Sequence, residues 1–160
     1  MIMNTDFKDI LLPNYRYCFV CGHENPRGLQ KRFYVRNGHV FTEFITESWM
    51  IGYAETIHGG IVSTLLDEII IWAAYEATGK FGATAELNVR FKRPLTVDQT
   101  YIVEGWFDED KGKIWTAFAH IKNSESQIMA RAAGKIFPFS EEINRTFCEA
   151  IEKSGYRKPS

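Results

Sequence analysis

One segment, residues 59–77, has apolar positions around nearly its whole circumference when it is read as a helix. It contains no proline and, after position 60, no glycine. A helix that is apolar nearly all round is a buried helix. One stripe differs, because its first positions are polar and keep the i, i+3, i+4, i+7, i+8 spacing of a single helix face: Gly60, Ser63, Thr64, Asp67 and Glu68. The same face continues through apolar residues to Tyr75, so it predicts a pocket lining with a polar end and an apolar end.

The remaining pattern is that of strands and short turns. Asn37-Gly38 separates two alternating runs, at about 31–36 and 39–46, and this dipeptide is the strongest short hairpin signal. Residues 84–92 alternate strictly and end before Pro94, which predicts a strand. Further strands at about 99–107, 113–122 and 127–137 are joined by short turns and imply an antiparallel meander. Ser140 is the predicted N-cap of a last helix that reaches about residue 153.

This order of elements predicts an α+β fold, in which a strongly curved antiparallel β-sheet wraps around one long central helix and a C-terminal helix is added. We expect an N-terminal leader over residues 1–16, one folded domain over 17–138, and a C-terminal helix and tail over 139–160. Because one sheet covers only one side of the central helix, the other side is predicted to need a second subunit.

The composition of the chain mainly excludes classes of protein. A chain of 160 residues with 45% hydrophobic and 24% charged residues is typical of one folded soluble domain. A net charge of -1 gives no basic field for nucleic acid. The start of the chain lacks the pattern of a signal peptide, and the longest apolar run, residues 69–75, is far too short to span a bilayer. We therefore expect a cytoplasmic protein with no nucleic-acid or membrane partner.

The cysteines present two alternatives. The chain has three, Cys18, Cys21 and Cys148, and an odd number argues against a disulfide framework. The Cys18-x-x-Cys21 spacing, with His23 close by, is typical of half a zinc site, but zinc needs a fourth ligand and usually a second pair. The favoured interpretation is two reduced thiols in a turn-rich loop, so no metal is predicted.

The start of the central helix carries candidate chemistry. Its first amides have no acceptor within the helix, and the helix dipole adds partial positive charge there. Glycine at positions 59 and 60 lets a ligand approach the backbone closely. A Gly59 amide directed at a thioester or ester carbonyl would stabilise the oxyanion by about 3–4 kcal/mol. The alternative is that both glycines merely permit a tight turn into the helix.

Asp67 lies in an otherwise apolar run, where an unpaired carboxylate is costly. Its structural interpretation is an aspartate satisfied by Ser63, Thr64 or a basic partner. Its functional interpretation is a general base or a nucleophile, a role that Glu68 would take if the helix phase were shifted. Gly59 and Asp67 are eight residues apart, which is about 12 Å along a helix. One carbonyl cannot reach both, so we expect a composite site at a dimer interface.

Three further positions are candidates. His58, at the mouth of the helix, would either orient the acyl carbonyl or hold the turn through a backbone hydrogen bond. Thr84 would bind the attacking water or only satisfy a strand edge. The basic residues around Arg90 and Lys92 would form a solvated strand face or meet phosphates.

Three segments in this order resemble the hotdog-fold acyl-CoA thioesterases, in their PaaI-like branch. They are the Cys18–Gly22 motif with the Asn-Pro-Arg-Gly-Leu run at 25–29, the His58-Gly59-Gly60 start followed by Leu-Leu-Asp-Glu at 65–68, and the strand from Thr84 to Leu95. The resemblance covers about residues 17–137. It implies the hotdog fold, dimers and often tetramers, and hydrolysis of acyl-CoA to free acid and CoA without a further cofactor.

The resemblance also implies residue roles. Asp67 would be the base or nucleophile, the Gly59 amide the oxyanion donor, and His58 an aid at the carbonyl; Thr84 would match a threonine found beside the acid in some relatives. The substrate would be bound by the polar helix stripe and the following strand, at Gly60, Ser63, Glu68, Asn88, Arg90 and Lys92. Some relatives carry an asparagine shortly before the histidine, where this chain has Gly52-Tyr53-Ala54-Glu55.

Two other functions remain as alternatives to thioester hydrolysis. One is a non-catalytic hotdog protein that binds acyl-CoA or another acyl ligand in the same cleft. The other, ranked lower, is a hotdog hydratase or dehydratase, since those enzymes typically pair a catalytic histidine with an acid elsewhere. The sequence does not identify the acyl group.

Overall fold

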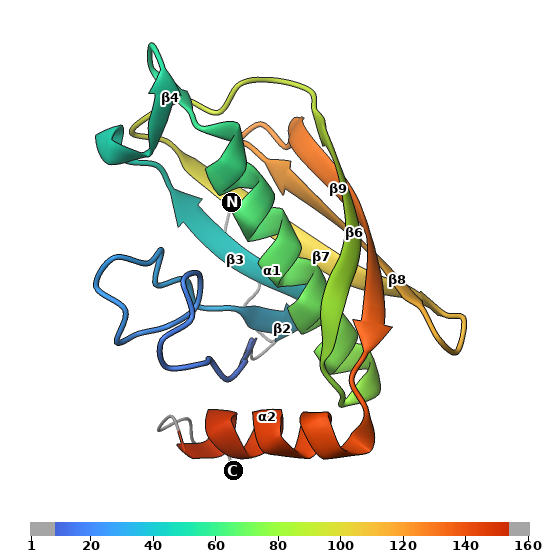
Figure 1. Ribbon diagram of the computed structural model, residues 1–160. Coiled ribbons are helices and arrows are strands. Elements are labelled where there is room, and N and C mark those ends of the chain that lie inside the picture. The colour runs from blue at the N-terminus through green and yellow to red at the C-terminus, as the bar shows by residue number, and fades with distance from the viewer. Residues whose placement is uncertain (1–8, 154–160) are drawn as a thin grey trace.

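In the described residues, 9–153 of this computed structural model, seven strands form one antiparallel sheet along a single long helix, α1 (Figure 1). The strand order is β1-β2-β3-β7-β8-β9-β6, and β4 and β5 form a separate small pair. The elements are β1 (Ile10–Leu11), β2 (Tyr34–Arg36), β3 (His39–Ile45), the 3-10 turn η1 (Ser48–Met50), β4 (Ile51–Tyr53), β5 (Thr56–Ile57), α1 (Gly59–Thr78), β6 (Gly82–Phe91), β7 (Thr100–Asp110), β8 (Trp115–Lys122), β9 (Ile128–Pro138) and α2 (Glu141–Lys153).

Helix α1 lies against the sheet because its apolar side chains are buried there. The buried positions are Val62, Leu65, Leu66, Ile69, Ile70, Trp72, Ala73 and Ala74. Glycine at position 134 of β9 makes room for the helix, because an added Cβ would lie 2.1 Å from Ile70 Cδ1. It ends at Gly79, whose φ of 70° is left-handed and whose N–H bonds the Tyr75 carbonyl, as glycine C-caps do. The buried side chains therefore set how the helix lies against the sheet, and the Gly79 cap sets where it ends.

The local sequence signals are confirmed. Asn37 and Gly38, with φ of 51° and 76°, form the tight turn between β2 and β3. Strands β7, β8 and β9 form the antiparallel meander, and Ser140 Oγ accepts a hydrogen bond from the Ile143 N–H at the start of α2. The α+β fold with one central and one C-terminal helix is thus the observed architecture. None of the helices in residues 9–153 is long and apolar enough to cross a membrane.

The strand after α1 departs from the strict alternation that its sequence suggests. Its register against β9 shifts between Thr84 and Glu86, so an irregularity separates the start of β6 from the rest. Beyond this point Leu87 and Val89 pack on the core, while Phe91 is 54% exposed. Strand β6 is also the last strand of the sheet, so one of its edges is unpaired in a single chain.

The N-terminal segment covers part of the side of α1 that faces away from the sheet. Val20, Cys21, Leu29 and Phe33 are buried in the same core as the helix, and the Phe33 ring stacks on Trp72 with 6.3 Å between centroids. Strand β1, within the predicted leader, pairs with β2. Residues 1–8 of that leader and 154–160 of the predicted tail lie outside the described residues. This chain's own loop thus encloses a part of the helix for which a second subunit was predicted.

Candidate functional site

His58 caps the start of α1. Its Nδ1 accepts a hydrogen bond of 2.9 Å from the Gly60 N–H, which places the ring proton on Nε2. A Cβ at position 60 would lie 2.9 Å from that nitrogen, so the cap needs glycine there. Two roles were predicted for His58, and the hydrogen bond to the Gly60 N–H is the one that holds the turn. The His58 carbonyl accepts from Ile61, and the Gly59 N–H is left without an acceptor in the described part of the chain.

A cavity of about 390 Å³ opens beside this free amide. It combines apolar walls with two basic residues, and its lining is Tyr53, Thr56, Ile57, Gly59, Val62, Phe91, Lys92, Arg93, Pro94 and Leu95. The Arg93 guanidinium donates to the Ile128 carbonyl at 3.0 Å and is thereby anchored, while Lys92 is exposed. The fold thus brings Gly59 and Lys92, two predicted site residues, to one place, where a helix N-terminus and two cations favour an anion.

Asp67 lies two turns further along α1. Its Oδ1 is buried and has no hydrogen-bond partner in the described residues. The hydroxyl groups of Ser63 and Thr64 do not supply one, because they donate to the carbonyls of Gly59 and Gly60 at 2.8 Å. Asp67 is also absent from the lining of the cavity at Gly59. A buried carboxylate oxygen left unbonded is costly and is typical of a functional group.

The other predicted residues lie on β6. Thr84 is half-buried at the register shift, and Asn88 and Arg90 are exposed on the edge strand. None of the three lines the cavity beside Gly59, whereas Lys92, just after the strand, does. In a single chain the predicted residues therefore lie in three places. Gly59 and Lys92 line the cavity at the start of α1, Asp67 lies in the middle of that helix, and the remaining residues of β6 lie on an edge strand.

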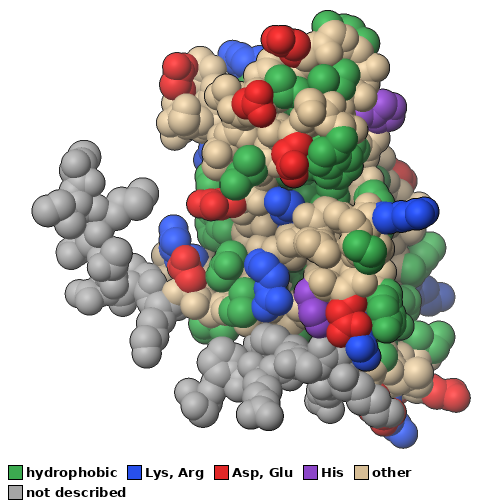
Figure 2. Space-filling model, turned by 90° about the vertical axis from the view of Figure 1, so that its left-hand side faces the viewer, with side chains coloured by type: hydrophobic (Ala, Val, Ile, Leu, Met, Phe, Trp, Pro, Cys, Tyr) green, Lys and Arg blue, Asp and Glu red, His purple; other side chains and the backbone are tan. Residues whose placement is uncertain are grey.

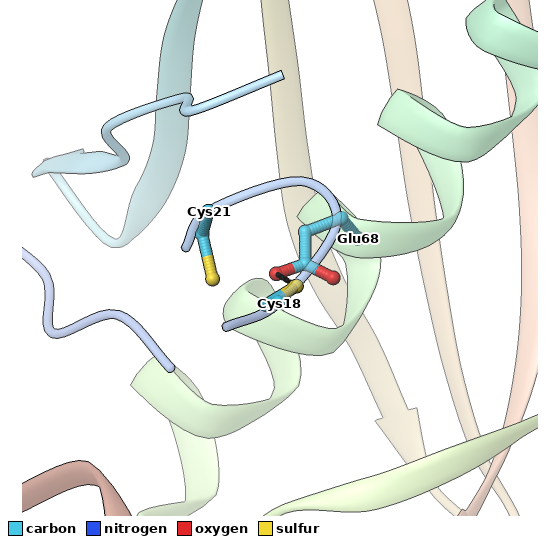
Figure 3. Close-up of side chains that lie close together, drawn as sticks. All are labelled: Cys18, Cys21 and Glu68. Atoms are coloured by element: carbon cyan, nitrogen blue, oxygen red, sulfur yellow. Dashed lines mark hydrogen bonds between the residues drawn. The ribbon is translucent and has the colours of Figure 1, made fainter. Parts of the chain in front are cut away.

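Glu68 has a different environment from its neighbour Asp67. Its Oε1 accepts hydrogen bonds from Trp72 Nε1 at 3.0 Å and from the Cys18 thiol at 3.5 Å, and burial raises the pKa of Glu68 to about 7. A hydrogen bond from the Cys21 thiol lowers the pKa of Cys18 to about 5, and the pKa of Cys21 is correspondingly raised. Figure 3 shows the three side chains together. Sequence reasoning singled out each of them but not their meeting, and it expected Glu68 to line the substrate pocket instead.

A second polar cluster, on β3, β7 and β8, was missed altogether. Glu104 accepts hydrogen bonds of 2.7 Å from His39 and from His120. Burial raises the pKa of Glu104, but the bonds from the two histidines outweigh it and leave that pKa below its usual value; burial lowers the pKa of His120. Only cross-strand register brings these residues together, so no local signal could find them.

Acidic and basic side chains are interspersed on the face that Figure 2 presents, unlike the continuous basic surface of a nucleic-acid-binding protein.

The chain is similar to known thioesterase proteins. The family model described as "Thioesterase superfamily" matches residues 54–130, which include α1 and its cap. An uncharacterized protein of Schizosaccharomyces pombe is 26% identical over 105 residues, which are 63% of this chain and 60% of that protein. The chain thus matches less than two thirds of that relative's length.

Two solved structures share the fold. A hypothetical thioesterase of Streptococcus pneumoniae, solved with coenzyme A, superimposes with a TM-score of 0.61 and 21% identity over 66% of this chain and 84% of that one. The PaaI protein of the E. coli phenylacetic acid degradation operon superimposes with a TM-score of 0.60 and 17% identity, over 64% of this chain and 74% of that one. The family match covers the two later motifs read from the sequence, at 58–68 and 84–95, and the shared architecture is the fold that the resemblance implied. The chain therefore has the hotdog fold, and its residues 54–130 match the thioesterase superfamily.

Proposed function

We propose that the protein is an acyl-CoA thioesterase, which hydrolyses a thioester to free acid and CoA at sites built by two copies of the chain. The observation that carries the proposal is the presence on one helix of a free backbone amide, at Gly59, and a buried carboxylate oxygen without a partner, Asp67 Oδ1. These are the oxyanion donor and the base that acyl transfer to water requires.

Similar proteins and the local charges support CoA as the leaving group. The pneumococcal neighbour was solved with coenzyme A, and a Streptococcus mutans neighbour was solved bound to acetyl CoA. Variants of the pneumococcal protein were made at an aspartate and at a threonine, the residue types of Asp67 and Thr84. In this chain, Lys92 and Arg93 supply two cations beside the cavity at Gly59 that suit the phosphates of CoA.

The proposed reaction uses the residues as follows. Asp67 accepts a proton from a water molecule while that water's oxygen attacks the thioester carbonyl carbon. The Gly59 N–H of the other copy donates a hydrogen bond to the carbonyl oxygen as negative charge develops there. The carbon–sulfur bond then breaks, and the CoA thiolate takes the proton back from Asp67. Free acid and CoA leave, and Asp67 is again a carboxylate.

Two copies are needed because α1 separates its own two groups. Gly59 is the first residue of the helix and Asp67 the ninth, so they lie about 12 Å apart along the axis. Strand β6, whose outer edge is unpaired and which carries the exposed Phe91, is the surface we propose for pairing two copies. A two-fold axis there would give each dimer two equivalent sites.

A pair of substitutions tests the composite site. Gly59→Pro removes the amide but suits the first helical position, because His58 already has the extended ψ of 128° that proline requires before it. Gly59→Ala is the matched control, since it keeps the N–H and its Cβ would meet Phe91 at an ordinary 3.4 Å. We expect Gly59→Pro and Asp67→Asn each to lower kcat about 100-fold or more, and Gly59→Ala, which keeps the N–H, to lower it far less.

Mixing the two inactive variants is the decisive measurement. Each heterodimer would regain one intact site, so a fully exchanged equal mixture should recover about a quarter of the wild-type rate of CoA release. Verified heterodimers without recovery would overturn the composite site. Release should be followed over short, medium, long and aryl acyl-CoA; binding without any hydrolysis across that panel would instead make the protein a non-catalytic acyl-CoA binder.

A further inference from the structure

The loop that carries Cys18 and Cys21 is folded so that both sulfur atoms receive backbone N–H groups. Val20 donates to Cys18 Sγ at 3.3 Å, and Tyr15 donates to Cys21 Sγ at 3.4 Å. The turn is closed by a hydrogen bond of 3.0 Å from the Gly22 N–H to the Cys18 carbonyl. A Cβ at position 22 would lie 2.4 Å from that oxygen, so the turn requires glycine there. Amide donors directed at sulfur stabilise negatively charged thiolates, the form in which cysteine binds metals.

A third donor comes from the central helix. Glu68 places a carboxylate oxygen beside the two sulfurs, and the three ligand atoms all lie within 4.8 Å of one another (Figure 3). Tetrahedral ligands of a zinc ion are about 3.5–3.8 Å apart, so side-chain rotations that shorten the longest separation by about 1.0–1.3 Å would bring the three atoms to coordination distance. Three groups that are anionic when deprotonated are held together here, which a cation would stabilise.

We propose that Cys18, Cys21 and Glu68 bind a divalent transition-metal ion, with Zn²⁺ as the best match, and that this ion fastens the N-terminal loop to α1. Two thiolates select zinc over magnesium or calcium, which prefer oxygen ligands. Both cysteines bind as thiolates, so any thiol proton still held is released to solvent, and the cysteines stay reduced.

The fourth coordination position falls to a water molecule or another small ligand. The same three residues line a cavity of about 260 Å³ with Tyr15, Ile71, Trp72, Phe81 and Phe147, which leaves room for one. His23, the nearest histidine in the sequence, is not the fourth ligand, because it lies outside the cluster and its two ring nitrogens face Asn14 and Glu24. The site shares no residue with the proposed hydrolytic pair, since it contains neither Gly59 nor Asp67.

The test uses the full chain, stripped of metal and reduced, with Zn²⁺ and Co²⁺ as the probes. We expect one Zn²⁺ per chain after dialysis, a higher Tm with zinc than with chelator, and a thiolate-to-cobalt charge-transfer band with Co²⁺. Cys18→Ser and Glu68→Gln should each weaken Zn²⁺ binding at least tenfold to about a hundredfold. Cys148→Ser, a change of the thiol on α2, is the matched control and should leave binding unchanged.

Three results would overturn the proposal. One is metal content no higher than in a Cys18→Ser/Cys21→Ser double variant, and another is equal loss of binding in the Cys148→Ser control. The third is a cysteine pair that oxidises to a Cys18–Cys21 disulfide and gives no cobalt–thiolate band after reduction. If Cys18→Ser does not fold, the wild-type cobalt spectrum and Glu68→Gln, which removes only the helix ligand, still decide the question.

Discussion

Replacing Asp67 by alanine is expected to make the protein more stable and less active at the same time. The reason is the buried Asp67 Oδ1, which lost its contacts with water on folding and has no hydrogen-bond partner in residues 9–153. A structural aspartate would be bonded, and its loss would weaken the fold. A general base for water must instead keep an oxygen free for substrate, so its removal relieves an unfavourable burial and abolishes the proton transfer.

The magnitude follows from the burial of one unbonded polar atom. Leaving a buried donor or acceptor unsatisfied costs about 1–3 kcal/mol, and for a chain of 160 residues each kcal/mol corresponds to about 2–4 °C in Tm. The substitution should therefore raise Tm by about 2–12 °C while kcat falls by about 10²–10⁴.

Alanine also favours a helix over aspartate, so a control must remove that contribution. Thr64→Ala lies on the same helix face and has a similar gain in helix propensity, but it loses only a hydroxyl that bonds the Gly60 carbonyl. The two variants should be compared by thermal unfolding at equal chain concentration, because an oligomer's Tm depends on concentration. An Asp67→Ala protein that unfolds several degrees below both the wild type and Thr64→Ala would refute the reasoning and make Asp67 structural.

Two more predictions concern stability. Gly60→Ala should fail to bring the gain of about 0.5–1 kcal/mol in the free energy of unfolding that glycine-to-alanine usually gives in a helix, measured by urea denaturation, since its Cβ would displace the His58 cap. Acidification should also destabilise the fold. His120 and Glu104 both have lowered pKa values, so the unfolded chain binds protons more readily and stability is lost as pH falls below 6.5 for His120 and below 4.5 for Glu104. Urea midpoints should therefore fall as the pH is lowered from 8 to 4, and a His120→Gln variant whose midpoint falls equally steeply below pH 6.5 would contradict this assignment.

The sequence is sufficient for the elements whose signals are local. The Asn37-Gly38 turn forms because both residues adopt the left-handed backbone that those residue types tolerate. Helix α1 begins and ends where its glycines indicate, because His58 caps one end and Gly79 the other. Such features depend on a few neighbouring residues, which a sequence displays directly.

Contacts between distant segments could not be predicted in the same way. Cys18 and Glu68 are 50 residues apart, and their meeting depends on how the N-terminal loop folds over α1. The histidines around Glu104 depend on the register between three strands. The shift near Thr84 breaks the alternation because the strand gains one unpaired residue, which its composition does not reveal.

The different environments of Asp67 and Glu68 follow from the geometry of the helix that carries both. Successive residues on an α-helix point about 100° apart, so two neighbouring carboxylates cannot face the same surroundings. Glu68 meets the N-terminal loop, where Cys18 bonds its Oε1, and Trp72, one turn further along α1, bonds the same oxygen. Asp67 Oδ1 has no partner in the described residues. The buried Ile69 and Ile70 hold the helix against the sheet and keep it from rotating. A metal ion on Glu68 would therefore fasten the same turn of helix from its other side, which makes the position of the Asp67 carboxylate depend on both the sheet and the loop.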